Sequence, residues 1–263
     1  IYLKRIQSIY INQVTVKAAN LTEIFEIFDK YNGMPYSVAW IDCLAKRNRI
    51  GRGIFIGGSF DDDGTLDYQM RKKLNIPFDF PSFCLNKFSV KAFNWIYYNR
   101  VLKKKSKKKV HFDDFFYPLD RINNWNRIYG KNGFTQYQFI LPLEKSYEGM
   151  TEILNKISDS GKGSFLAVLK LYGNENKNYL SFPMKGYSLA LDFKIEKNLF
   201  PLLDQLDDIV IKYGGRIYLA KDVRIKQKSF EMGYPDISKF REVRERYNCK
   251  QKINSLQSRR VGI

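Results

Sequence analysis

Between residues 134 and 221 the hydrophobic pattern changes its period several times in a fixed order. The stretch FTQYQFILP, at 134–142, alternates between apolar and polar positions, with Gln136 and Gln138 on its polar face. Apolar residues at helical spacing follow it, and later stretches alternate again. The pattern predicts strands at 134–142, 164–173, 187–193 and 216–221, and helices at 144–161 and 199–209.

This order, β-α-β-β-α-β, is that of the ferredoxin-like or split βαβ arrangement. It predicts an α+β fold in which an antiparallel sheet is covered by helices on one face. If the apolar face of each strand lies under the helices, a set of polar side chains emerges together on the open face. A face that is part polar and part apolar favours binding. The side chains placed there by the alternation are Gln136, Gln138, Lys170, Tyr172, Ser188 and Asp192.

The flanking regions extend this core. Upstream, the pattern predicts elements that widen the same sheet, namely strands at 11–19, 36–45 and 51–60 and a helix at 20–31. Residues 61–110 are irregular, aromatic and basic, and we expect them to cross the sheet as a long excursion. Downstream, 235–248 is predicted to form a charged helix. The tail, 252–263, has no clear period, so we expect it to lean on a neighbouring domain.

The chain of 263 residues carries 45 Lys and Arg against 27 Asp and Glu, a formal net charge of +18. This excess favours a polyanion or an anionic membrane surface as partner. The run KKKSKKK, at 103–109, predicts a solvated, mobile loop because like charges repel, with a membrane- or phosphate-facing role as the alternative. Basic residues are also interleaved with Tyr and Phe, so nucleic-acid binding stays open as a non-enzyme function, although no RNP, zinc-finger or helix-turn-helix motif is present.

The residue types disfavour several other kinds of site. Three scattered cysteines and one histidine, His111, predict no metal centre, disulfide framework or catalytic triad, and favour a reducing compartment. No apolar run is long enough to span a membrane, and the first residues lack the pattern of a secretory signal. The glycine-rich stretches 51–58 and 161–164 match neither the dinucleotide fingerprint nor the P-loop.

The last predicted strand ends in two opposite charges, Lys221 and Asp222. Strands end at surfaces, where charges are common, so a solvated pair is the simplest interpretation. The alternative is that the strand ends at a functional site. Lys221 shares its parity with Ile217 and Leu219, so the pattern does not decide which face it takes.

Eight stretches resemble the FAD-linked oxidases of the vanillyl-alcohol oxidase superfamily, in the same order along nearly the whole chain. They are YSVAWIDCLA (36–45), YPLDRINNWNRIYG (117–130), GFTQYQFILP (133–142), FLAVLKLYG (165–173), LSFPMKGYSLALDF (180–193), GGRIYLAKD (214–222), YPDISKFREVR (234–244) and INSLQSRRVGI (253–263). The resemblance implies a substrate-binding (cap) domain at 1–213 and a segment at 214–263 that completes an FAD-binding domain. The main FAD-binding lobe would precede this chain, which begins without an initiator methionine.

Carried over by position, the resemblance implies roles for individual residues. Lys221 matches the active-site lysine, with a catalytic role and a contact to the flavin, and we expect Tyr218 to contact the cofactor as well. Ser188 and Phe116 stand where an asparagine and a tyrosine are expected, and Ala190 stands where a cysteine is known. The residues that match the substrate pocket are Gln136, Gln138, Lys170, Tyr172, Trp40, Phe116, Trp125, Arg127 and Ser188.

The implied function is the substrate-binding part of an FAD-dependent oxidoreductase. It would oxidise a secondary alcohol of a sugar, the ribose 2′-hydroxyl of a polyprenylphosphoryl ribose, by hydride transfer to flavin, and would be inactive without the FAD lobe. The expected partners are this substrate, a short-chain NAD(P)H reductase that completes an epimerisation, and an anionic membrane surface, but not nucleic acid. The expected location is the cytoplasm or the periphery of the inner membrane. A flavin oxidase of a soluble sugar or an aldonolactone is the alternative.

Overall fold

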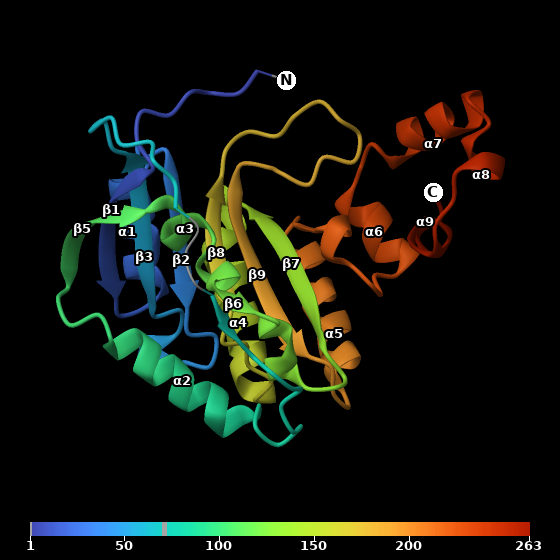
Figure 1. Ribbon diagram of the computed structural model, residues 1–263. Helices are drawn as coiled ribbons and strands as arrows, with labels where there is room; N and C mark the ends of the chain where they lie inside the picture. The colour runs from blue at the N-terminus through green and yellow to red at the C-terminus, as the bar shows by residue number, and fades with distance from the viewer. Residues whose placement is uncertain (1, 70–72) are drawn as a thin grey trace.

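A large antiparallel sheet forms the centre of the computed structural model, which describes residues 2–69 and 73–263 (Figure 1). Within these residues the sheet has eight strands in the order β10-β7-β9-β8-β2-β3-β1-β5. The strands are β1 (Tyr10–Ala18), β2 (Tyr36–Ile41), β3 (Gly53–Phe60), β5 (Lys105–His111), β7 (Phe134–Pro142), β8 (Ala167–Tyr172), β9 (Gly186–Lys194) and β10 (Arg216–Ile217). A small parallel sheet pairs β4 (Leu74–Asn75) with β6 (Ile122–Asn123). The predicted α+β class with an antiparallel sheet is confirmed.

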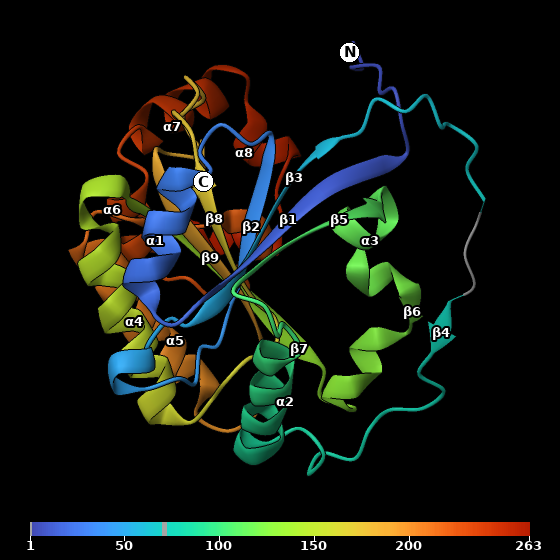
Figure 2. The ribbon, with the colours of Figure 1, turned by 90° about the vertical axis from the view of Figure 1, so that its left-hand side faces the viewer.

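Three helices, α1 (Leu21–Lys30), α4 (Ser146–Ser160) and α5 (Leu199–Lys212), lie together on one face of the sheet (Figure 2). Their buried residues recur at helical spacing and pack into one core with the apolar faces of the strands. The other described helical segments are α2 (Lys87–Asn99), α3 (Phe112–Phe116), α6 (Gln227–Gly233), α7 (Ile237–Arg246), α8 (Cys249–Lys252) and α9 (Leu256–Val261), and the 3-10 turns η1 (Arg47–Arg49), η2 (Pro118–Arg121), η3 (Trp125–Tyr129), η4 (Leu143–Lys145) and η5 (Leu219–Lys221).

The same order of elements occurs twice in the sheet. The sequence β1-α1-β2-β3-α2-β5 in the first half corresponds to β7-α4-β8-β9-α5-β10 in the second. In each half the first and third strands are central, the fourth lies at the outer edge, and the second joins the other half through the pairing of β2 with β8. The prediction that the upstream block widens the sheet is therefore confirmed. Helix α2 departs from this symmetry, because it does not join α1, α4 and α5 (Figure 2).

The prediction of a mobile loop at 103–109 was wrong, as was the prediction that 61–110 are irregular throughout, since they contain α2. The lysine run forms most of β5, which pairs with β1 along its whole length. Successive strand residues point to opposite faces, so neighbouring lysines separate and their repulsion is reduced. Lys104 pairs with Glu23, and Lys109 with Asp61. Lysines on an edge strand also oppose pairing with other chains.

Two predictions near the C-terminus need correction. The strand expected at 216–221 ends at Ile217, and Lys221 lies in the 3-10 turn η5. The tail is not without structure of its own: residues 256–261 form α9, whose start is capped by Ser255, and its Val261 is fully buried within this chain. A helix this short has a weak periodic signal, which explains why the pattern did not reveal it.

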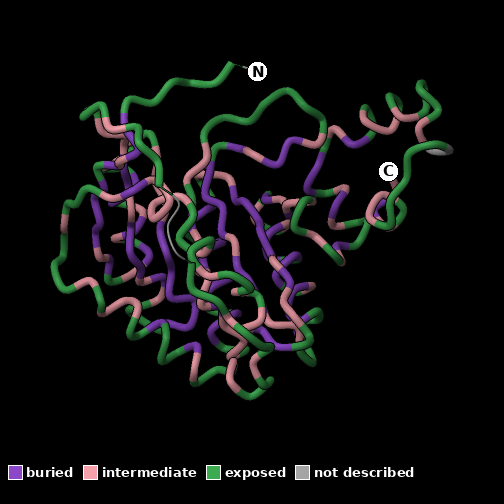
Figure 3. The backbone as a smooth tube through the Cα atoms, in the orientation of Figure 1, coloured by how far each residue is buried: buried purple, intermediate pink, exposed green. Residues whose placement is uncertain are grey.

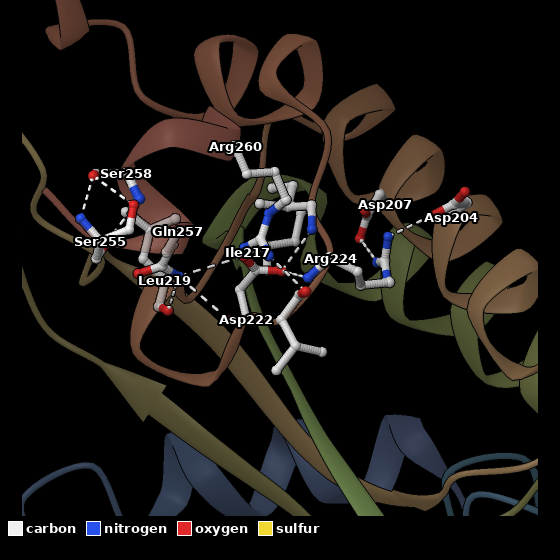
Figure 4. Close-up of polar contacts among 12 residues, drawn as sticks. Asp204, Asp207, Ile217, Leu219, Asp222, Arg224, Ser255, Gln257, Ser258 and Arg260 are labelled. Atoms are coloured by element: carbon white, nitrogen blue, oxygen red, sulfur yellow. Dashed lines mark hydrogen bonds and ion pairs between the residues drawn. The ribbon is translucent and has the colours of Figure 1, made fainter. Parts of the chain in front are cut away.

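A buried polar cluster joins α5 to the segment after β10 (Figure 4). The Tyr137 hydroxyl donates to Asp207 at 3.0 Å, and the Arg224 guanidinium lies 2.7 Å from the same carboxylate. Arg224 also pairs with Asp204 at 2.5 Å. Burial raises the pKa of Asp207 to about 6, although the positive charge of Arg224 opposes this rise.

The raised pKa of Asp207 gives a prediction for stability. The folded state binds this proton more tightly than the unfolded chain does, so the contribution of Asp207 to the free energy of unfolding falls as the pH rises from about 4 to about 6. Asp207→Asn lacks this titration. The difference in the free energy of unfolding between wild type and variant should therefore change by about 3 kcal/mol across that window. Urea denaturation at several pH values measures it.

The exposed neighbour provides the control for this experiment. Asp208→Asn removes the same charge from an exposed position one residue away, so any effect of the charge change alone should appear in both variants. A constant difference between wild type and Asp207→Asn from pH 4 to 6 would contradict the burial of a titrating Asp207.

Candidate functional site

The register of the second half of the sheet brings the predicted polar residues onto one face. Gln136 lies opposite Asp192, and Lys170 lies opposite Ser188. Tyr172 is two residues beyond Lys170 on the same side of β8. The large apolar residues between them, such as Phe139, point to the helices. The face opposite α4 and α5 is therefore shared by the predicted set, as the alternation implied.

Hydrogen bonds within this face hold the glutamines in place. The Gln138 side-chain amide donates to the Ser188 hydroxyl at 3.2 Å, and reaches the Tyr172 hydroxyl at 3.5 Å. Both Gln138 and Ser188 are buried. The Gln136 amide donates to the Asp192 carboxylate at 2.7 Å. Each amide is thus oriented by a neighbour on the next strand before any ligand is present.

Lys221 lies beside these amides. It lines a small crevice together with Gln136 and Gln138. Burial raises the pKa of Asp192, while the hydrogen bond from Gln136 and the positive charge of Lys221 lower it, which places the ammonium within electrostatic reach of that carboxyl. Lys221 and Lys170 are both exposed, and neither side chain makes a hydrogen bond or ion pair among the described residues. Two exposed cations therefore border a face of preoriented amides.

The turn that carries Lys221 is fixed by its neighbour and by the C-terminal helix (Figure 4). One Asp222 oxygen accepts the backbone N–H groups two and three residues further on, at 2.8 and 2.7 Å. The other oxygen pairs with Arg260. The Gln257 amide donates to the Leu219 carbonyl at 2.6 Å. Asp222 is therefore a structural anchor, whereas Lys221 beside it is held in position with its ammonium free.

An aromatic cluster adjoins the glutamines. The Tyr218 ring stacks on Phe182 with centroids 4.3 Å apart, and Tyr172 meets the same ring edge-on at 6.0 Å. The Tyr218 backbone N–H donates to the Gln138 carbonyl at 2.8 Å, so the strand pairing extends to the start of the turn. On the other side of Tyr218, an open groove of about 760 Å³ is lined by the loop after β8 and by α7 residues including Phe240.

Other predicted pocket residues lie away from this group. Trp40 is on the same sheet face but is buried: its indole N–H donates to the Phe165 carbonyl at 2.9 Å and its ring packs on Tyr97 of α2. Phe116 packs edge-on against Tyr36, over the first half of the sheet.

The "WNR" residues also have local partners. Trp125 packs against Phe134 at 5.3 Å. The Arg127 guanidinium donates to the backbone carbonyls of Ile76 at 3.0 Å and Pro77 at 2.7 Å, so it holds the segment around β4. The structure thus brings together Gln136, Gln138, Tyr172, Ser188 and Lys221, with Lys170 on the same face, and places Trp40, Phe116, Trp125 and Arg127 outside this group.

Several residues of this region were missed in the sequence. Gln257 and Arg260 lie in the tail, where only the capping sequence SLQS hinted at a helix. Tyr129 is fully buried, and its hydroxyl has no hydrogen-bond partner among the described residues. Its pKa is raised by burial and further by the charge of Asp192, so it lies near the same carboxyl. No local pattern marks such a contact.

The described residues also hold no group of three or more His, Cys, Asp and Glu side chains arranged to bind a metal ion. In the same part of the chain, no helix has both the length and the apolar character needed to cross a bilayer.

Comparison with known proteins gives relatives for this chain. No protein-family model matches it. It is 31% identical over 115 residues, 43% of the chain, to an uncharacterised protein of Streptomyces coelicolor, covering 31% of that protein. It is 34% identical over 237 residues, 87% of the chain, to decaprenylphosphoryl-β-D-ribose oxidase of Mycolicibacterium smegmatis, and spans about half (51%) of that protein. The resemblance predicted from the sequence is therefore confirmed: over most of its length, the chain is similar to one half of this oxidase.

Proposed function

We propose that this chain is the substrate-binding part of an FAD-dependent oxidoreductase that oxidises the 2′-hydroxyl of a polyprenylphosphoryl ribose. One observation carries the proposal. Gln136, Gln138 and Lys221, which come from a strand and a distant turn, line one small crevice, together with residues that include Leu203 of α5 and Arg224. The similarity to decaprenylphosphoryl-β-D-ribose oxidase supports the same assignment.

The residues on this face suit a phosphorylated sugar. Amide groups donate to and accept from hydroxyl groups, so Gln136 and Gln138 orient the ribose. The ammonium of Lys170 is exposed without a carboxylate partner and attracts the phosphoryl group. Lys221 stabilises the negative charge that develops on the reacting oxygen as the hydroxyl proton passes to solvent water. Fixed groups of this kind are most effective because they need no reorganisation during the reaction.

The same face fits a flavin. Lys221 is a cationic donor on a clamped turn with no hydrogen-bonding partner in the described chain, and Tyr218 precedes it with a half-buried ring. These two residues would contact the cofactor, and the rest of its binding site would come from another region. When bound, FAD supplies the acceptor for the hydride of the carbinol carbon.

A related oxidase acting on a soluble sugar or an aldonolactone is the second candidate. This chain has Ser188 and Phe116 where the resemblance predicts an asparagine and a tyrosine, and these two differences favour the second candidate. Ser188 is the direct partner of Gln138, so a side chain shorter than asparagine alters that hydrogen-bonding position. For the first candidate, the ketone product would require a short-chain NAD(P)H reductase to return it to an alcohol of opposite configuration.

The two candidates predict different substrates for the full-length gene product. Under anaerobic conditions, a prenylphosphoryl ribose should bleach the visible absorbance of bound flavin, because hydride transfer reduces it. Free ribose and aldonolactones should not. Bleaching by the soluble compounds alone would select the second candidate, and a protein without flavin absorbance would remove both.

Gln138 should contribute to substrate orientation. Gln138→Ala removes an oriented amide, so kcat/KM should fall about fivefold, the effect of one lost hydrogen bond of roughly 1 kcal/mol. Gln205→Ala, an exposed glutamine on α5 on the far side of the sheet, is the matched control and should retain wild-type kinetics. Equal rates for Gln138→Ala and wild type would argue against this role.

The charge of Lys221 should be measurable through Asp192. Lys221 lowers the pKa of Asp192 in the folded chain, so Lys221→Gln should raise that pKa further. The Asp192 side chain should then become ionised only at a higher pH than in the wild type. Carboxyl carbon chemical shifts followed by NMR report it. Lys170→Gln serves as the control, since Lys170 is not among the charges that act on Asp192. If neither substitution moves the titration, Lys221 does not lie where the site requires it.

A further inference from the structure

Helix α2 carries apolar side chains on the side that faces away from the protein. Phe88, Trp95 and Ile96 are 81, 59 and 61% exposed, and they recur with Ala92 at the spacing of one helical stripe. Leu102, just after the helix, is 90% exposed. Monomeric soluble proteins rarely display a continuous apolar surface of this kind without a binding partner. We call Phe88, Trp95, Ile96 and Leu102 the outer stripe.

The inner side of α2 is packed against the rest of the chain. The exposed apolar side is therefore not a core-facing side that has turned outward. Val90 is buried, and Tyr97 packs against Trp40. Asn94 is fully buried and donates to Asp42 at 2.8 Å. A polar residue is therefore directed inward while Trp95, the next residue, is directed outward. Solubility alone would favour the opposite arrangement, with the polar residue exposed and the tryptophan buried.

Basic residues surround the outer stripe. Residues 87–110 contain nine Lys and Arg and no Asp or Glu. The end of α2 is tied to the sheet edge beside β5, since the Lys17 ammonium donates to Asn99 at 3.3 Å and the Lys17 backbone N–H to Lys104 at 2.9 Å. Figure 1 shows α2, the following loop and β5 along one margin of the molecule, and Figure 3 shows many exposed residues along this margin, among others that are intermediate or buried.

Carboxylates of this chain neutralise only some of the lysines of this margin. Lys104 and Lys109 are neutralised by carboxylates of this chain. Lys103, Lys107 and Lys108 are exposed and make no ion pair among the described residues.

We propose that this margin, the outer stripe with the lysines of 103–109, docks on the surface of an anionic lipid bilayer. Aromatic and aliphatic side chains on one side of a helix enter the boundary between headgroups and acyl chains, and flanking lysines bind acidic headgroups. Single-stranded nucleic acid also combines cations with aromatic rings, but Ile96 and Leu102 cannot stack on bases. Lipid therefore accounts for the whole stripe. The proposal stands without the oxidase function, although a polyprenyl-linked substrate would be met at the same surface.

Vesicle sedimentation of the full-length gene product tests the proposal. Binding to phosphatidylcholine vesicles that contain phosphatidylglycerol should be strong at low salt, weaken with salt, and be weak for phosphatidylcholine alone. The double variant Trp95→Ser, Ile96→Ser should lose about tenfold or more in affinity because it removes inserted apolar area. The triple variant Lys103→Gln, Lys107→Gln, Lys108→Gln should lose the salt-dependent part.

Matched controls separate docking from general charge and hydrophobicity. Phe200→Ser changes an exposed aromatic residue on α5, and Lys145→Gln, Lys156→Gln, Lys228→Gln removes the same charge elsewhere; both should bind vesicles as the wild type does. Lipids brominated in their acyl chains should quench the tryptophan fluorescence of the wild type, and Trp95→Phe should abolish most of that quenching. This optical signal requires only a folded protein, which circular dichroism verifies.

Three outcomes would overturn the proposal. They are wild-type protein that does not bind anionic vesicles, variants of the margin that bind as tightly as the controls, and binding to single-stranded DNA or RNA that depends on these residues while vesicle binding is absent. None of these readouts depends on flavin or on turnover. A failed docking test therefore leaves the proposed oxidase function standing, and loss of oxidase activity leaves docking standing.

Discussion

The candidate site depends on the register of β7 against β9. In this pairing Gln136 meets Asp192 and Gln138 meets Ala190, while Phe139 enters the core. A slip of one residue would direct the glutamines into the helix layer and bring Phe139 to the surface, so hydrophobic burial in the core also fixes the direction of the amides. The apolar face of each strand thus fixes the direction of the side chains on its polar face. Fold stability and the geometry of the site arise from the same alternation.

Lys221 depends on a different constraint. A single 3-10 turn has little stability of its own, so its position must come from contacts made elsewhere. Asp222 supplies the first of these, because its carboxylate accepts the backbone N–H groups of the two residues 224 and 225, just after the turn, and pairs with Arg260. Gln257 adds a bond to the Leu219 carbonyl. The C-terminal helix, more than thirty residues further along, therefore places the ammonium beside the sheet.

These two constraints explain what the sequence predicts and what it does not. Alternation is a local property, so the face shared by Gln136 and Gln138, and the order of strands and helices around them, follow from the sequence alone. The end of the last strand and the helical tail are set by contacts of Asp222 with Arg260, which are distant in sequence. The prediction for the lysine run was wrong for another reason. Its charge predicts a loop, but pairing with β1 and the carboxylates of Glu23 and Asp61 stabilise a strand there. Local propensity was overruled by tertiary context.

The two proposed surfaces are connected through the sheet. One row of paired residues crosses the strands β7, β9, β8 and β2, and it consists of Gln138, Ala190, Val168 and Trp40. The Trp40 ring packs against Tyr97 of α2. Three strand spacings separate the ends of this row, about 15 Å. If both proposals hold, a lipid chain that leaves a sugar at Gln138 and follows this row reaches the inner side of α2, and the outer stripe lies on the opposite side of that helix. On the sheet side, buried Asn94 is accounted for by its hydrogen bond to Asp42, and on the outer side, exposed Trp95 is accounted for by the proposed contact with lipid.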